Sequence, residues 1–311
     1  IDVDAFVDQH LHVEFTKQID GYRLSSYYSK DRNGKLKPEP IWDWNLSFGN
    51  ADYLQGGKTS GWYWNLQGEG MGSGEHIWLR RLVYGQPNID GANPANGPGD
   101  PDFRQKITDR WAVLRTNVLN GDRVVARINE LATLLTEAAG RNYAKYPGIL
   151  NTYLWPNPQG PPNWDVDYTQ PTYAEIISEM AKWTQGRFVW MDSQFLQNPR
   201  FNLNPGPVQA GASLTLSASA GSIYYTLDGS DPRLPGGRIS PAATRYTSSI
   251  KLNANARVVA RAYSNPTALW TPWSGPADAT FVVQTPKLVI TEIMYQDRKS
   301  TRLNSSHGYI S

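Results

Sequence analysis

The chain has 311 residues, of which 40% are hydrophobic and 19% are charged, with 12 Trp, 17 Tyr and no Cys. The aromatic content excludes a disordered chain, and the absence of Cys excludes a disulfide framework and a thiolate metal site. The net charge of +2 is too small to indicate a nucleic-acid partner, and no apolar run reaches the ~20 residues that a membrane-spanning helix needs.

The first predicted elements are a helix and a β-hairpin. Apolar residues over 3–15 recur at helical spacing, which favours an amphipathic helix with Asp2 as its N-cap. Strand-like runs at 22–29 and 41–46 then flank the turn pair Asn33-Gly34. An Asn-Gly pair between two such runs predicts a hairpin.

Three further helices are predicted after two Gly- and Pro-rich loops, which cover 49–76 and 87–101. Apolar residues at helical spacing indicate one helix over 103–118 and a second over about 124–143. The third helix begins at the sequence TYAE (172–175), which is typical of a capping box.

The character of the chain changes after Pro199. Over 207–284, short strand-like runs alternate with Gly, Asn, Asp and Pro, which is typical of a small β-sandwich. Ten of the 12 Trp lie before residue 200, so the two parts differ in kind. We therefore expect two domains, with a boundary near 200–206.

Two carboxylates flank the predicted hairpin: Asp20 precedes it and Asp43 follows it. Because a hairpin returns its two ends to each other, these side chains are candidates for a common cleft. If 41–46 is a strand, Asp43 and Asn45 share one face, where their oxygens would suit Mg²⁺. In the alternative interpretation, Asp20 caps a turn and Asp43 pairs with an Arg.

The segments around both acids also resemble a known family. The sequences IDGYRLSSYY (19–28) and PIWDWNLSFGNADY (40–53) resemble the spore-coat CotH kinase family, whose members are atypical secreted kinases, and shorter matches continue to WMD (190–192). The resemblance covers roughly residues 1–200. It implies an α+β fold, in which the helical larger lobe of an atypical protein-kinase-like fold carries a β-hairpin and precedes an all-β immunoglobulin-like sandwich.

The resemblance implies roles for three residues. Asp20 takes the place of the catalytic Asp that orients or deprotonates the acceptor hydroxyl, and Asp43 that of the metal-binding Asp. Asn45 is a candidate second metal ligand, because Ser residues occupy the stretch where a kinase usually has an Asn. The implied cofactors are ATP and Mg²⁺, and the implied reaction transfers the ATP γ-phosphoryl group to a hydroxyl of an acceptor protein.

By the same resemblance, the smaller lobe with its phosphate-binding Lys and a signal peptide would lie before Ile1. This fragment alone is therefore expected to be inactive. The intact protein is expected outside a bacterial cell or at its surface, with no membrane span and no nucleic-acid partner.

Two other parts of the chain have their own resemblances. The sequence GSIYYTLDGSDPR (221–233) resembles the immunoglobulin-like module at the C-terminus of chitobiases and hexosaminidases, over about 205–284. Its Asp228 and Asp231 are expected to bond local backbone in a turn, rather than to bind calcium or a glycan. Residues 286–296 resemble the first strand of a lamin-tail domain, and 297–311 resemble a translated library adapter and are expected to be a non-native tail.

A second function remains open at this point. A non-catalytic surface protein could bind glycans or other proteins through the β-sandwich and through exposed aromatic side chains, with Trp62, Trp64, Trp155 and Trp164 as candidates. Stacking of sugars on Trp needs neither a metal nor a pair of carboxylates. Buried positions for most of these large side chains would argue against it.

Overall fold

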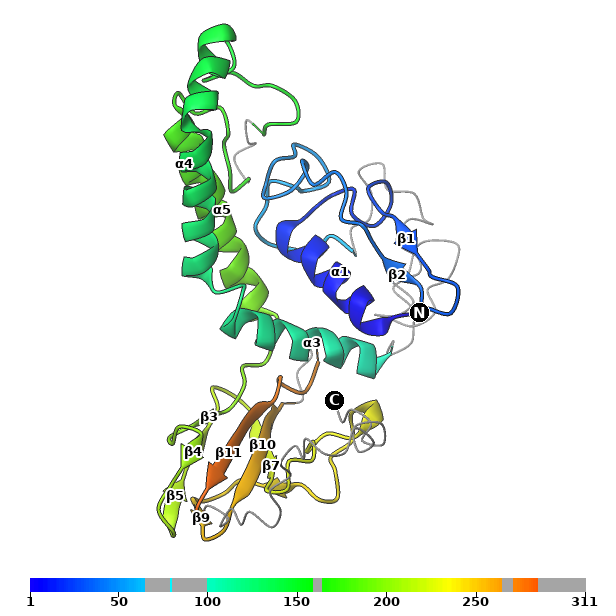
Figure 1. Ribbon diagram of the computed structural model, residues 1–311, viewed down its shortest axis with the longest axis vertical. Helices are drawn as coiled ribbons and strands as arrows, with labels where there is room; N and C mark the ends of the chain where they lie inside the picture. Colours follow the sequence, from blue (N-terminus) through cyan, green and yellow to red (C-terminus); the bar gives the residue numbers. More distant parts are fainter. Residues whose placement is uncertain (65–78, 80–99, 159–163, 265–270, 285–311) are drawn as a thin grey trace, which may run out of the picture.

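The computed structural model describes residues 1–64, 79, 100–158, 164–264 and 271–284. A helical region over 1–199 precedes a β-rich region over 200–284, so the fold is α+β as predicted (Figure 1). The predicted lamin-tail start and the predicted non-native tail lie outside the described residues.

The chain begins with the predicted helix, α1 (Val3–Thr16), whose N-cap Asp2 accepts a hydrogen bond from the backbone N–H of Ala5. Lys17, the C-cap that follows α1, has a left-handed backbone with φ 50°. The predicted hairpin follows as two very short antiparallel strands, β1 (Tyr28–Ser29) and β2 (Lys37–Pro38).

The prediction of a strand over 41–46 is wrong. These residues form an irregular segment with a turn, and Asp43 has a left-handed backbone with φ 55°. Such a residue breaks the alternation of side chains that a strand requires, and Asp tolerates this conformation better than most residues do. The argument that Asp43 and Asn45 share one face of a strand therefore fails.

The three later helices of the prediction are confirmed as α3 (Pro101–Thr116), α4 (Gly121–Lys145) and α5 (Tyr173–Ser193). At the start of α5 the hydroxyl of Thr172 accepts a hydrogen bond from the Glu175 N–H, as the capping-box pattern predicted. Helices α4 and α5 pack along each other, and α3 packs against α1 (Figure 1). Among the described helices, none is long and apolar enough to cross a bilayer.

Aromatic rings fill the core between these helices. Phe15 of α1 lies 4.5 Å from Phe188 of α5 and 6.1 Å from Trp111 of α3, measured between ring centroids. Tyr63 and Trp64 extend this core and are almost completely buried. This end of the loop therefore belongs to the interior of the helical region, whereas Ser60 is exposed.

The described part of the β-rich region contains a five-stranded sheet in the order β4-β11-β10-β7-β8 and two two-stranded sheets, β3-β6 and β5-β9. The strands are β3 (Arg200–Phe201), β4 (Gly206–Pro207), β5 (Ala212–Leu214), β6 (Leu216–Ser217), β7 (Ser222–Thr226), β8 (Thr244–Arg245), β9 (Ile250–Leu252), β10 (Ala256–Tyr263) and β11 (Ala277–Val282). Leu214, Val258 and Phe281 are fully buried in its core. The small β-sandwich of the prediction agrees with this all-β arrangement.

The two regions meet where the β-rich region contacts α3. Arg261 of β10 is 3% exposed and donates to both carboxylate oxygens of Asp109 on α3 and to both of Asp231. The same Asp231 accepts from the backbone N–H of Arg233, and Asp228 accepts from Ser230. The acids of this turn thus bond local backbone, as expected, and Asp231 also joins the two regions.

Candidate active site

The structure brings the segments of Asp20 and Asp43 together. Asp20 lies in the turn that follows α1, and its carbonyl accepts from the N–H groups of three residues further along the turn. The side-chain amide of Gln18 accepts the Asp20 N–H at 3.2 Å and donates to the Asp43 carbonyl at 2.5 Å. The Ile19 N–H donates to the Leu46 carbonyl at 3.3 Å, so two links join the segments.

The two carboxylates lie in different surroundings. The Asp20 side chain is 15% exposed and lies 3.4 Å from Nη2 of Arg23, whereas Asp43 is exposed. Burial raises the pKa of Asp20, Arg23 opposes this, and the negative charge of Asp43 raises it further. A carboxylate whose pKa is raised closer to neutral pH is a stronger base, and is better suited to accept a proton from a hydroxyl group.

Hydrogen bonds from buried polar residues hold the turn of Asp20 in place. The Tyr63 hydroxyl donates to the carbonyl of Ile19, next to Asp20. Glu14 accepts hydrogen bonds from the Tyr22 hydroxyl and from the backbone N–H groups of Tyr63 and Trp64, at 2.8–2.9 Å. Sequence reasoning missed these residues; the one available signal was a charged Glu14 between apolar neighbours on the helix.

The donor set fits a magnesium ion that is bound together with a nucleotide. Within the described residues there is no group of three or more His, Cys, Asp or Glu that could hold a metal. Mg²⁺ usually takes one or two carboxylates and completes its shell with water and substrate phosphates. Asp43 supplies one exposed carboxylate for such an ion, whereas the Asp20 carboxylate lies beside Arg23.

Asn45 lines a cavity away from the two acids. It is exposed, its carbonyl accepts from Nδ2 of Asn50, and it lines a cavity of about 480 Å³ together with Phe48 and Met180. Neither of the two acids lines this cavity. No contact recorded for the described residues joins the Asn45 side chain to either acid, and its role as a ligand stays a prediction.

Three of the four Trp that the glycan-binding alternative needs are not exposed. Trp64 is 1% exposed, and Trp62 is packed between Trp190 and Phe195. Trp164 is half-buried, and a Cβ placed on Gly57 would collide with its ring. Trp155 alone among the four is exposed, at 64%. The structure therefore gives little support to sugar stacking through this set.

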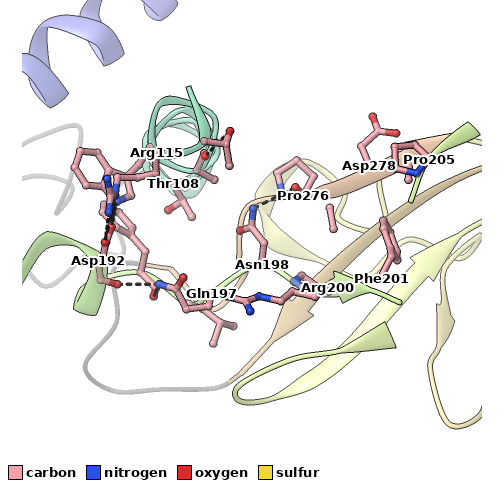
Figure 2. A pocket seen from close by; sticks show the side chains of 18 residues that line it. Thr108, Arg115, Asp192, Gln197, Asn198, Arg200, Phe201, Pro205, Pro276 and Asp278 are labelled. Atoms are coloured by element: carbon pink, nitrogen blue, oxygen red, sulfur yellow. Dashed lines mark hydrogen bonds and ion pairs between the residues drawn. The ribbon is translucent and has the colours of Figure 1, made fainter. Parts of the chain in front are cut away.

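Asp192, which ends the WMD motif, has a structural role. Its carboxylate accepts from Arg115 through Nε and Nη2 and from the indole N–H of Trp111, at 2.9–3.2 Å. Figure 2 shows Arg115 and Asp192 facing each other at one end of a cavity of about 500 Å³ between the helical and β-rich regions. This acid fixes α5 to α3 at a distance from the hairpin.

Comparison with known families agrees with both parts of the structure. A family model described as CotH kinase protein matches residues 1–191. A second model, described as Fn3 associated, matches residues 213–269. Neither describes a nucleic-acid-binding family. No curated protein matches the chain.

Proposed function

The chain belongs to the CotH kinase protein family, and from this premise we propose that the protein is an atypical kinase. It transfers the γ-phosphoryl group of ATP to a hydroxyl group of an acceptor protein and requires Mg²⁺. The observation that carries the proposal is the link between the backbones of Asp20 and Asp43 through one buried amide, which joins the segment of a shielded carboxylate to that of an exposed one.

In this reaction the hydroxyl oxygen of the acceptor forms a bond to the γ-phosphorus while the bond between that phosphorus and the ADP oxygen breaks. Asp20 orients the hydroxyl and accepts its proton. Asp43 binds the metal, and Mg²⁺ supplies positive charge that offsets the charge on the phosphates. Arg23 lies beside Asp20 and favours its ionised form, which is the form that can accept a proton.

The test uses the gene product that contains this chain, with Asp20→Asn and Asp43→Asn as variants. Each is expected to lower Mg²⁺-dependent transfer of radiolabel from ATP to protein by about 100-fold or more. Asp43→Asn is also expected to weaken Mg²⁺-dependent nucleotide binding, because the metal loses a charged ligand. The matched control is Asp31→Asn, which removes an exposed carboxylate at the tip of the hairpin.

The two variants separate the assigned roles. Full activity in Asp20→Asn would remove Asp20 from the mechanism, and unchanged metal-nucleotide binding in Asp43→Asn would do the same for the metal role of Asp43. Since the resemblance is to secreted kinases, we also propose that the protein acts outside a bacterial cell or at its surface. Fractionation of the producing cells tests this location.

A further inference from the structure

Gln18 lies between the end of α1 and Asp20 and is fully buried. Both ends of its side-chain amide are used: Oε1 accepts the Asp20 N–H, and Nε2 donates to the Asp43 carbonyl. Only one orientation of the amide satisfies both partners, because a backbone N–H needs an acceptor and a carbonyl needs a donor. The contact is therefore directional as well as buried.

The segment of Asp43 has little regular structure to fix it. Asp43 is in the left-handed region of backbone conformation, and its neighbours over 41–46 belong to no strand. In a sheet, ladder hydrogen bonds would set the distance between two such backbones. Here the Gln18 amide bonds to Asp43 itself, while the bonds from Ile19 to Leu46 and from Trp44 to Thr16 hold the neighbouring residues of the segment.

We propose that Gln18 is a positioning residue of the phosphotransfer site. It fixes the backbone of Asp43 relative to that of Asp20, so that the metal-binding carboxylate and the proton acceptor keep one separation. This inference rests on the proposed function. Residues that orient metal ligands from outside the coordination shell affect metal affinity strongly, and Gln18 holds the backbone of Asp43 in that way.

The test variant is Gln18→Met, which keeps the length of the side chain and removes both hydrogen bonds. The chain offers a matched control in Gln105→Met. Gln105 is 3% exposed, and its Nε2 donates to Oδ1 of Asp109 at 2.8 Å and to the Ser274 carbonyl at 3.1 Å. The control thus removes the same amide from an equally buried position at the contact between the two regions.

Binding of Mn²⁺ to the full chain is measured from the loss of the electron paramagnetic resonance signal of the free ion, and thermal unfolding shows that each variant is folded. Gln18→Met is expected to weaken Mn²⁺ binding by about tenfold or more. Gln105→Met is expected to leave it unchanged, and Asp43→Asn to abolish it.

The outcomes distinguish the two hypotheses. If Gln18→Met binds Mn²⁺ as tightly as the unmodified chain, the positioning role is overturned and the proposed function stands. If the unmodified chain binds no Mn²⁺, or if binding survives Asp43→Asn, the proposed metal site fails and the positioning role fails with it.

A second measurement applies if Gln18→Met does not fold. In the unmodified chain, Mg²⁺ is expected to slow hydrogen exchange at the Asp20 amide, because a metal on Asp43 restrains the carbonyl that Gln18 holds. The Gly34 amide, which donates to the Asp31 carbonyl in the hairpin turn, is the control and should not change. Equal exchange at Asp20 with and without Mg²⁺ would overturn the positioning role.

Discussion

The helical and β-rich regions differ in how their buried backbone groups find hydrogen-bond partners. In the helical region, the charged side chains of Glu14, Lys17 and Arg187 are fully buried, and each bonds to backbone atoms of the loop over 58–64. In the β-rich region, the core around Phe281 is apolar, and ladder hydrogen bonds satisfy the backbone of the strands.

The difference shows what an irregular loop requires where part of it is buried in a protein. Buried backbone groups need partners, and a loop has no neighbouring strand to supply them. Lys17 donates to the carbonyls of Lys58 and Ser60, and Arg187 donates to those of Thr59 and Gly61. Since this loop leads to Tyr63 and so to the turn of Asp20, the candidate site depends on these buried charges.

The largest expected effect follows from removing one of them. Arg187→Met leaves the Glu14 carboxylate, 3.5 Å from the guanidinium, without its buried counter-charge. Breaking a buried ion pair in this way should lower the free energy of unfolding by about 3–5 kcal/mol. Urea unfolding followed by Trp fluorescence checks this, because ten of the 12 Trp lie in the helical region.

The control exchanges an Arg for Met in the β-rich region. Arg257 pairs with Asp278 on the surface of the sheet, and both side chains are well exposed. Exposed pairs of this kind contribute little to stability, so Arg257→Met should unfold like the unmodified chain. If the two variants lose equal stability, the contrast between the regions does not come from burial of charge.

A smaller effect is expected at the contact between the regions. Arg261 is buried, but its partners Asp109 and Asp231 are 31% and 44% exposed and can bind water when it is removed. Arg261→Met should therefore cost about 1.5–3 kcal/mol, as expected for lost hydrogen bonds to charged groups. Calorimetry should show the β-rich region unfolding at a lower temperature than the helical region. A variant in which both still unfold together would show that other contacts hold the junction.

Local signals in the sequence were sufficient for the helices. The N-cap Asp2 and the capping box at Thr172 were predicted correctly because each depends on residues within one turn of the chain. The segment over 41–46 was predicted wrongly because its aromatic residues are typical of strands, while the left-handed backbone of Asp43 leaves no mark in an alternating pattern.

The candidate site was predictable only in part. The hairpin argument and the family resemblance predicted that Asp20 and Asp43 approach each other. The link between them was not predictable, because Gln18 is an ordinary polar residue until its two backbone partners are known. The support from Arg187 was also hidden, since it bonds to the carbonyl of Glu14, 173 residues away.

The smallest expected effect concerns pH and the helical region. His10 is fully buried, its Nδ1 lies 2.9 Å from the Tyr22 hydroxyl, and burial lowers its pKa from 6.5 to about 3. The unfolded chain therefore binds a proton on His10 below pH 6.5 that the folded chain does not bind until about pH 3, so stability is lost as pH falls through this range.

At about pH 5.5 the loss from His10 should be about 1.4 kcal/mol relative to pH 8. His10→Gln removes the titrating group, so its stability should fall by that much less over the same range in urea unfolding. The β-rich region has no His over 200–284, and its stability should lack this contribution. An equal loss in His10→Gln and the unmodified chain would mean that another group titrates, and the pH response would then no longer distinguish the helical region from the β-rich region.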